Sequence, residues 1–281
     1  MTQSKLGTGT NYAGLSGFTW PSGQNPQLFN VIDTKKHEHY KLPFSDYNII
    51  QDSGSENSQI GLTGELFTEA NFNSLRAQIK KTSLDSDGEI QDYNQKLYLN
   101  SNSKFRWVRG LSFTDKRAGD RPVSYPYTCT LISVFPFIYH DALAGGSNTT
   151  TNTTVTVSGS GLDNDGTAYV FPWFEITNND GASITAISIT DGTNTMTWSG
   201  TLEVNKSIRI VQEYNAEYGL DAWTVYKYDN ENFTGTPSVV SGLSGDKIYF
   251  DADSESNSID MTLTGNNDTA TAAVRFRERD Y

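Results

Sequence analysis

Two histidines in the segment KKHEHYK, residues 35 to 41, are the first residues whose types and spacing could do chemistry. His37 and His39 stand two positions apart, so a β-strand would place both imidazoles on one side, where they could bind a metal ion. A structural zinc site takes four nitrogen or sulfur ligands, and no third ligand stands near this pair in the sequence. The remaining histidine, His140, belongs to no recognisable Ser/His/Asp order. The histidines therefore predict neither a metal site nor a catalytic triad.

Aspartate-rich segments are the second candidate chemistry. LDSDGE, residues 84 to 89, and LDNDGT, residues 162 to 167, resemble calcium-binding loops. An EF-hand loop also needs a third acidic or amide ligand before its glycine and a bidentate glutamate six residues beyond it, and both segments fail on this spacing. The series Asp251, Asp253 and Glu255 could form a loose cation site, although charges on a strand edge also discourage sheet-to-sheet pairing. Turns and a solvated edge are the favoured interpretations.

Sugar chemistry gives the third set of candidates. Glycoside hydrolysis needs two carboxylates facing each other across a cleft, and a chain with 33 acidic residues nominates no particular pair. Trp173, Trp198 and Trp223 could contact carbohydrate by stacking on sugar rings, although tryptophans of a β-sandwich are more often core residues. No motif predicts catalysis. We therefore expect a protein that is not an enzyme, requires no cofactor and works through its surfaces.

The elements that must position these residues are predicted to be mostly β-strands. Hydrophobic residues make up 36% and aromatic residues 12% of the 281 residues, which favours cores of rings and β-branched side chains. No apolar run is long enough to span a bilayer, and the N-terminus lacks the apolar core of a signal peptide, so we expect a soluble protein without membrane insertion. The single cysteine, Cys129, lies in the apolar run TCTLISVF and is predicted to be buried.

The net charge of −12 is unevenly distributed along the chain. Up to His140 there are 14 Lys and Arg against 13 Asp and Glu, which gives +1; from Asp141 onward there are 7 against 20, which gives −13. A strongly acidic surface repels phosphate backbones and anionic lipids, so we expect no sequence-specific nucleic-acid binding. The near-neutral first half could pack against copies of itself without a large repulsive term.

The stretch LAGGSNTTTNTTVTVSGSG, residues 143 to 161, is the clearest candidate for a boundary between two domains. Its Gly, Ser, Thr and Asn residues predict a linker over 143–153, between a domain at 1–142 and a domain at 154–281. Beyond it, short alternating runs such as SITAISIT and SIRIVQEY are separated by turns, without a helical segment, which is typical of a β-sandwich.

The stretch IGLTGELFTEANFNSLRAQIKK, residues 60 to 81, contains the one predicted helix, near residues 68–81. Thr68 is the expected N-cap, and Phe67 and Phe72 stand at the two positions of a hydrophobic staple. The stripe formed by Phe72, Leu75 and Ile79 is expected to face inward and cover one face of a sheet.

The other side of this helix carries the predicted contact residues. Arg76, Lys80 and Lys81 are expected to be exposed and available to a neighbouring subunit. We expect the helix to be a lid over the sheet that the flanking strands form.

The order of these pieces resembles the distal tail protein family of long-tailed, non-contractile (siphovirus-type) viruses of bacteria and archaea. A short strand ending in LTGEL leads into the helix, an irregular loop and the strands KFRWVRGLSF and YTCTLISVFPFIY, as in that family's N-terminal domain. GTAYVFPWFEITNNDG resembles the opening of its C-terminal domain, LEVNKSIRIVQEYN its central hairpin, and AVRFRERDY its terminal strand. The resemblance covers most of the chain, and residues 1 to 60 match least well.

The resemblance implies a mainly β fold, with an N-terminal ring-forming β-sandwich or barrel with one covering helix and a C-terminal galectin-like β-sandwich. It implies a structural virion protein, made in the host cytoplasm and located at the distal end of the tail. There, six copies would form a ring that links the tail-tube protein to the tail-hub and tip proteins of the baseplate. The C-terminal sandwiches would project outward, where they could hold a receptor-binding protein or touch host glycans. The resemblance carries no residue-level role to this sequence.

Three alternatives remain open at this point. A free carbohydrate-binding, lectin-like protein would be a monomer or dimer whose tryptophans respond to sugar. A glycan-cleaving enzyme would require a carboxylate essential for turnover. A tail-tube subunit would use its second half to decorate a stack of rings rather than to cap one.

Overall fold

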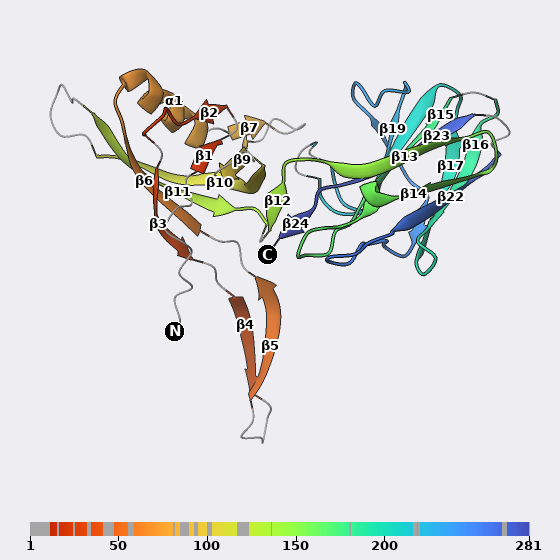
Figure 1. Ribbon diagram of the computed structural model, residues 1–281, viewed down its shortest axis with the longest axis horizontal. Coiled ribbons are helices and arrows are strands. Elements are labelled where there is room, and N and C mark those ends of the chain that lie inside the picture. Colours follow the sequence, from red (N-terminus) through yellow and green to blue (C-terminus); the bar gives the residue numbers. More distant parts are fainter. Residues whose placement is uncertain are drawn as a thin grey trace. The chain divides into compact units, whose positions relative to one another are not determined.

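The computed structural model describes residues 12–15, 17–24, 26–32, 35–41, 48–55, 59–80, 82–84, 90–92, 95–99, 103–116, 124–135, 137–179, 181–215, 218, 220–265 and 269–280. The chain divides into two compact units, Met1–Asp141 and Ala142–Tyr281, and each is described by itself. Strands dominate the described residues of both units, and the single α-helix among them lies in the first unit (Figure 1). The prediction of a mainly β protein with one helix is confirmed. Among the described residues, no helix has the length and apolar character needed to cross a membrane.

The first unit is built on one antiparallel sheet with the strand order β2-β1-β9-β10-β11-β6-β3. Its long central strands β10 and β11 pair in antiparallel register, and β11 also pairs along its length with β6. The short strand β12 (Ile138–His140) pairs with the beginning of β10. The strands are β1 (Tyr12–Leu15), β2 (Phe18–Thr19), β3 (Gln27–Ile32), β6 (Gln59–Leu66), β9 (Gln95–Leu99), β10 (Lys104–Asp115) and β11 (Tyr125–Ser133).

Two separate hairpins interrupt this sheet in the sequence. Strands β4 (Lys35–Lys41) and β5 (Asn48–Ser55) form one two-stranded sheet, and β7 (Thr82–Leu84) and β8 (Ile90–Asp92) form another. The β4–β5 hairpin leaves the main sheet after β3 and returns at β6, and these two strands pair with each other. Within the described residues, neither β4 nor β5 pairs with any other strand.

Helix α1 (Glu69–Ile79) covers one face of the main sheet, and the predicted apolar stripe of Phe72, Leu75 and Ile79 is buried. The helix begins at Thr68, whose side chain accepts a hydrogen bond from the backbone of Asn71, so the predicted N-cap is confirmed. Its end lies against β10 at Gly110, where a Cβ atom would stand 1.8 Å from the carbonyl oxygen of Ile79. Only glycine permits this close approach of helix and strand.

The staple expected at the start of the helix is not a buried pair. The ring of Phe67 is 58% exposed, whereas Phe72 is completely buried and packs against Phe113 and Tyr125. The backbone N–H of Phe67 is held by the side chain of Gln24. Phe67 is therefore a surface residue of the first unit.

The core of the first unit contains a hydrogen bond between two large aromatic side chains. Trp20 donates a hydrogen bond from Nε1 to the hydroxyl of Tyr127 over 2.7 Å. Gly64 on β6 leaves room for this hydroxyl, because a Cβ atom there would lie 2.7 Å from it. Cys129, on β11, is buried as predicted, and burial raises the pKa of its thiol to about 12.

The second unit is a sandwich of two antiparallel sheets. One sheet has the order β13-β23-β15-β18-β19-β20, and the other has the order β14-β22-β16-β17-β21. A 3₁₀ turn at Ser160–Leu162 and the short strand β24 (Arg279–Asp280) complete the unit. The strands are β13 (Ala144–Thr150), β14 (Thr154–Ser158), β15 (Trp173–Asn178), β16 (Ile184–Thr190), β17 (Thr195–Leu202), β18 (Lys206–Val211), β19 (Thr224–Tyr228), β20 (Ser238–Val240), β21 (Leu243–Gly245), β22 (Ser258–Thr264) and β23 (Ala270–Phe276).

The inner faces of both sheets supply one hydrophobic core. Along β15 and β18, Phe174, Ile176, Ile208 and Ile210 point inward and are fully buried. The intervening residues point to the outer face of the first sheet, as the two-residue period of a strand requires.

The structure corrects the linker prediction over residues 143–153. Ala144–Thr150 is strand β13, which pairs along its whole length with β23, and Thr154–Ser158 is strand β14 of the opposite sheet. The glycines that suggested flexibility serve close packing instead. At Gly145, φ is +149°, and a Cβ atom would lie 2.2 Å from the carbonyl oxygen of Val274.

Candidate functional site

The three tryptophans predicted as carbohydrate contacts lie in different environments. Trp198 is buried in the sandwich core and donates from Nε1 to the carbonyl of Ser241 over 3.0 Å, so no sugar reaches its ring. Trp223 is half-buried and packs against the same core. Trp173 lies on the outer face of β15 but is only 8% exposed, and its indole donates to Glu175 Oε1 over 3.3 Å. Of the three, only Trp173 belongs to a polar cluster on a sheet face.

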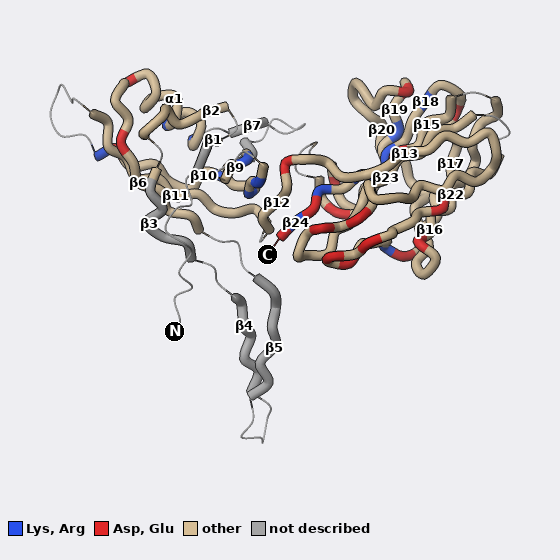
Figure 2. Tube along the Cα trace, viewed as in Figure 1, with Lys and Arg blue, Asp and Glu red and all other residues tan. Residues whose placement is uncertain are grey.

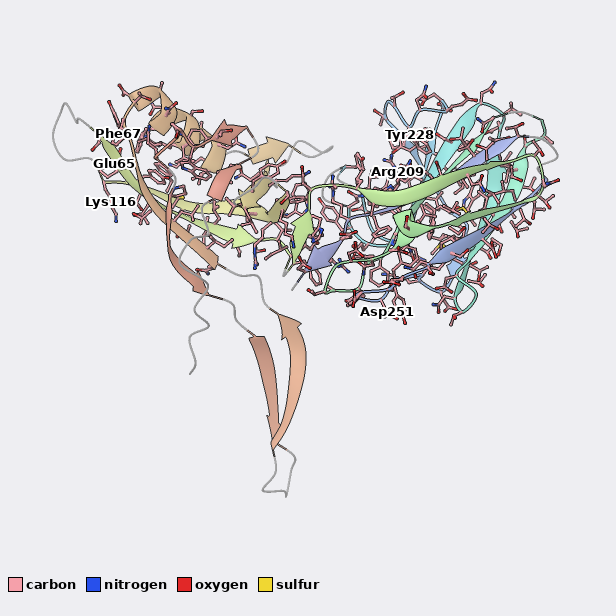
Figure 3. All side chains as sticks on the ribbon, viewed as in Figure 1. Glu65, Phe67, Lys116, Arg209, Tyr228 and Asp251 are labelled. Atoms are coloured by element: carbon pink, nitrogen blue, oxygen red, sulfur yellow. The ribbon has the colours of Figure 1, made fainter. Side chains whose placement is uncertain are left out.

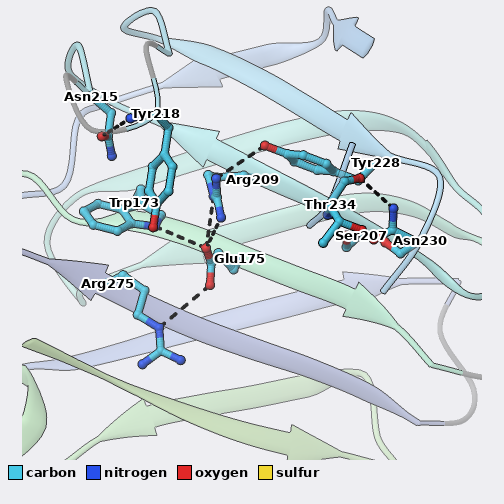
Figure 4. Close-up of polar contacts among 10 residues, drawn as sticks. All are labelled: Trp173, Glu175, Ser207, Arg209, Asn215, Tyr218, Tyr228, Asn230, Thr234 and Arg275. Carbon is cyan, nitrogen blue, oxygen red and sulfur yellow. Dashed lines mark hydrogen bonds and ion pairs between the residues drawn. The ribbon is translucent and has the colours of Figure 1, made fainter. Parts of the chain in front are cut away.

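That cluster is centred on a buried ion pair. Arg209 of β18 donates from Nε and Nη2 to Glu175 Oε1 over 3.0 and 2.7 Å, and both side chains are largely buried (Figure 4). The other oxygen of Glu175 lies 3.8 Å from Nε of Arg275, which stands opposite Trp173 in the pairing of β23 with β15. One carboxylate therefore serves two guanidinium groups.

Aromatic rings enclose Arg209. Its guanidinium lies 4.5 Å from the ring centroid of Tyr218 and 5.2 Å from that of Phe233, and Nη1 donates to the hydroxyl of Tyr228 over 3.3 Å. Burial raises the pKa of the Tyr228 phenol, and the charge of Arg209 opposes this change. Figure 3 shows Arg209 and Tyr228 together in the second unit. Tyr218 also meets Trp173 edge to face, at 6.3 Å between centroids.

A second group of rings precedes Trp173 in the sequence. Val170 and Phe250 pair through two backbone hydrogen bonds and point into the core, so their neighbours Tyr169, Phe171 and Tyr249 point outward. The ring of Phe171 lies edge to face with both tyrosines, at centroid distances of 5.6 and 6.2 Å. Tyr169, Phe171 and Trp173 thus alternate along one segment, with Tyr249 and Tyr218 beside them. We call these five residues the aromatic stripe.

Cations also accompany the second ring group. Arg279 lies 5.1 Å from the ring centroid of Tyr169, donates from Nε to its carbonyl over 2.6 Å, and pairs with Glu213 at 3.0 and 3.2 Å. Lys247 Nζ lies 5.3 Å from the ring centroid of Phe171. The stripe therefore combines rings with fixed charges, and the period-two pattern YVFPW is the sequence signal that would have revealed it.

The predicted contact residues of the helix are placed as expected where the structure describes them. Arg76 and Lys80 are exposed, and Lys81 lies outside the described residues. Two large apolar side chains of the same unit, Phe67 and Leu111, are also exposed. Figure 3 shows Phe67 on the same side of the first unit as Glu65 and Lys116. Whether these residues contact a neighbour stays a prediction.

The candidate metal ligands do not converge among the described residues, which contain no group of three His, Cys, Asp or Glu able to hold an ion. His37 and His39 stand on β4, and their side chains lie outside the described part. Asp251 and Asp253 are exposed.

Both aspartate-rich segments are predicted to be turns. In LDNDGT the backbone N–H of Gly166 donates to the side-chain oxygen of Asn164, and the buried amide of Asn164 donates to the carbonyls of Ala168 and Asp251, which fixes a loop. Residues 85–89 of LDSDGE lie outside the described residues.

Comparison with known proteins gives a fold match but no sequence match. No protein-family profile matches the chain, and no curated protein matches it. The chain is similar to the SPP1 Dit (gp 19.1) protein, described as a paradigm of the hub adsorption apparatus in phages that infect Gram-positive bacteria. This alignment has a TM-score of 0.52 and 12% identity over 96% of this chain and 98% of that chain.

Weaker similarity exists to chains of the phage P2 baseplate in its activated conformation. The structure with Ca gives a TM-score of 0.45 and 10% identity over 96% of this chain and 97% of that chain. The structure with Sr gives a TM-score of 0.44 and 9% identity over 95% and 96%. The match to SPP1 Dit alone, at a TM-score of 0.52 over 96% of this chain, shows a shared fold that includes both units.

Proposed function

We propose that this protein is a structural component of a phage tail of the long-tailed, non-contractile type. In this proposal, six copies form a ring at the distal end of the tail tube and join the tube to the tip or baseplate. The observation that carries the proposal is the fold shared with the SPP1 Dit protein, which extends over 96% of this chain and so includes both units in one order. Its work would be assembly rather than catalysis.

The β4–β5 hairpin supports a role in assembly. A two-stranded hairpin is at best marginally stable in water, because it buries little apolar surface and leaves two edges unpaired. Within the described residues, β4 and β5 pair only with each other. Pairing with the sheet of a neighbouring copy would satisfy an edge of this hairpin, and the terminal strands β2 and β3 of the main sheet are edges of the same kind.

The distribution of charge agrees with this arrangement. The chain up to His140 carries a formal charge of +1, so copies of the first unit can approach one another without strong repulsion. The chain from Asp141 onward carries −13, and Figure 2 shows acidic residues outnumbering basic ones there. Six such units would be best separated in solvent, outside the ring. A ring of this kind would contact the tail-tube protein on one side and hub or tip proteins on the other.

Removing the hairpin tests how the ring closes. In the variant, a short Gly-Ser turn replaces residues 36–54, and the control is Val239→Ser, at an exposed position of β20. We expect the control to form the same assembly as the wild-type protein and the hairpin variant to remain monomeric with both units folded. Analytical ultracentrifugation and circular dichroism measure these two properties. Rings that persist without the hairpin would assign closure to another surface.

A further inference from the structure

We propose that the β4–β5 hairpin of the first unit binds one divalent transition-metal ion, such as Zn²⁺, through His37, His39 and Asp52. The inference rests on the pairing of the two strands and does not depend on ring formation. The sequence alone predicts no such site, because it places no third ligand near the two histidines. The structure supplies a third residue from the opposite strand.

The register of the hairpin puts these three residues on one face. Strands β4 and β5 lie side by side (Figure 1), with His37 directly opposite Asp52 and His39 opposite Ile50. Residues directly opposite each other in an antiparallel pair share a face, and so do residues two positions apart in one strand. One face therefore carries both histidines and the aspartate, whereas Glu38 belongs to the other face.

The spacing of these positions suits a single ion. Cβ atoms of directly opposed residues lie about 5 Å apart, and positions two residues apart in a strand are about 7 Å apart. The diagonal between His39 and Asp52 is about 7 to 8 Å. Zinc bonds to nitrogen and oxygen are about 2 Å long, so imidazoles and a carboxylate at positions this close can reach a shared ion. The register shift between Lys35 and His37 lies outside this triangle.

The chemistry of the three residues selects the class of ion. Imidazole suits zinc and other first-row transition metals, and two histidines with one carboxylate are an established ligand set for them. The ions Ca²⁺ and Mg²⁺ prefer oxygen ligands, of which this set offers only one carboxylate. Three protein ligands leave at least one coordination position to water.

An ion pair between His37 and Asp52 is the alternative explanation of this register. A cross-strand pair of opposite charges stabilises a hairpin only weakly. Such a pair accounts for Asp52, but it does not account for a second histidine on the same face, opposite an isoleucine. A shared ion accounts for all three residues. The two explanations differ in whether the hairpin binds metal at all.

Metal binding would stabilise the pairing of β4 with β5. A two-stranded hairpin is marginally stable in water, and within the described part of the chain these two strands pair only with each other. An ion that binds the paired strands but not the separated ones shifts the equilibrium toward the paired form. We therefore expect the metal to order the hairpin before it contacts any other chain.

The test is a calorimetric titration of the 281-residue protein with Zn²⁺, after the protein has been prepared without a histidine tag and stripped of metal with EDTA. We expect one ion per chain, no competition from excess Ca²⁺ or Mg²⁺, and a visible absorption band when Co²⁺ replaces Zn²⁺. Hydrogen exchange, measured by mass spectrometry, should slow in β4 and β5 when Zn²⁺ is present.

Matched variants assign the ligands. His37→Gln, His39→Gln and Asp52→Asn should each weaken Zn²⁺ binding by about tenfold or more, and the Co²⁺ band should weaken with it. The control Glu38→Gln removes a carboxylate from the other face of the same strand and should leave the affinity unchanged. The variant in which a Gly-Ser turn replaces residues 36–54 should not bind the ion.

Three results would overturn the proposal. They are failure of the wild-type protein to bind Zn²⁺, unchanged binding by any of the three ligand variants, and an equal loss of binding in Glu38→Gln. An ion pair without metal predicts the first of these results.

The mass of the assembly, measured with and without EDTA, tests the ring proposal separately. Rings formed by a protein that binds no Zn²⁺ would leave the proposed function standing and remove the inference drawn here. A protein that binds Zn²⁺ through these three residues yet stays monomeric would retain the inference and lose the proposed function.

Discussion

Arg209 is a buried charged residue that links two loops of the second unit to its first sheet. It is a charged side chain on the outer face of a sheet, yet it is buried by Tyr218 and Phe233 and paired with Glu175. A buried charge is costly unless it is paired, and removal of one partner leaves the other uncompensated. Arg209 therefore connects two loops to the sheet as well as balancing Glu175.

Substitution of Arg209 is expected to destabilise the second unit. Arg209→Met should lower the free energy of unfolding by about 3 to 5 kcal/mol, because Glu175 stays buried without its main partner. The control is Lys206→Met, at an ion pair with Asp229 on the surface, which should cause no measurable change. Urea denaturation of both variants provides the comparison. Equal, small effects would show that the Arg209 pair contributes no more than a surface pair.

Cys129 should not react with thiol reagents in the folded protein. Burial raises its pKa to about 12, so at pH 8 almost none of the thiol is ionised, and reagents cannot reach it. We expect an aromatic disulfide reagent to label the native protein very slowly and the denatured protein at once. Because this is the single cysteine, the absorbance change reports it alone. Rapid labelling of the native protein would contradict the described core of the first unit.

The sequence predicted burial correctly for residues whose surroundings are set by their own segment. Cys129 was predicted to be buried because it stands in an apolar run, and Phe72 because it follows the spacing of an apolar helix stripe. In each case the whole signal lies within one segment of the sequence. Tyr169 and Phe171 escaped prediction, because their alternation lies before a regular strand and around Pro172. The cations beside them come from distant positions, Lys247 beside Phe171 and Arg279 of β24 beside Tyr169, and contacts between distant segments are not visible in a linear pattern.

At the scale of elements, helix α1 shows how sequence and packing agree. Its cap and its apolar stripe are local features, and both were predicted. Its end point depends on Gly110 of β10, which lets the helix carbonyls approach the strand closely. That requirement arises from tertiary contact, so the sequence of the helix itself does not contain it.

Two phenylalanines at the start of this helix form a matched pair of tests. Phe72→Ala should lower the free energy of unfolding by about 3 to 5 kcal/mol, since it removes a fully buried ring from the core. Phe67→Ala should change it by less than about 0.5 kcal/mol, because most of that ring is in solvent. Thermal unfolding followed by circular dichroism distinguishes them. A large loss for Phe67→Ala would mean that the staple contributes to folding after all.

Strand β13 is the element whose composition led to the wrong prediction of a linker. Gly, Ser and Thr are typical of linkers, but in β13 the glycines allow close approach to β23, and the threonines form part of an edge strand. Composition alone cannot distinguish these uses, because the deciding partner is more than 120 residues away, as the pairing of Thr149 with Thr271 shows. The structure therefore places the beginning of the sandwich several residues earlier than expected.

At the scale of the whole molecule, the charge distribution and the fold both support the proposed ring. Each unit has its own hydrophobic core, and the acidic residues are concentrated in the second. The sequence predicted the mainly β architecture, and the structural similarity to SPP1 Dit extends it to a complete fold. Assembly depends on contacts between copies, so it could not be predicted from the pattern of strands and charges within one chain.

The most direct test of the central claim is the oligomeric state of the purified 281-residue protein. Six copies of a 31.1 kDa chain have a mass of about 187 kDa. Light scattering combined with negative-stain imaging should find this mass and single rings with six-fold symmetry and a central opening, rather than stacked tubes. A strictly monomeric protein at high concentration, with no rings on the grids, would contradict the proposal.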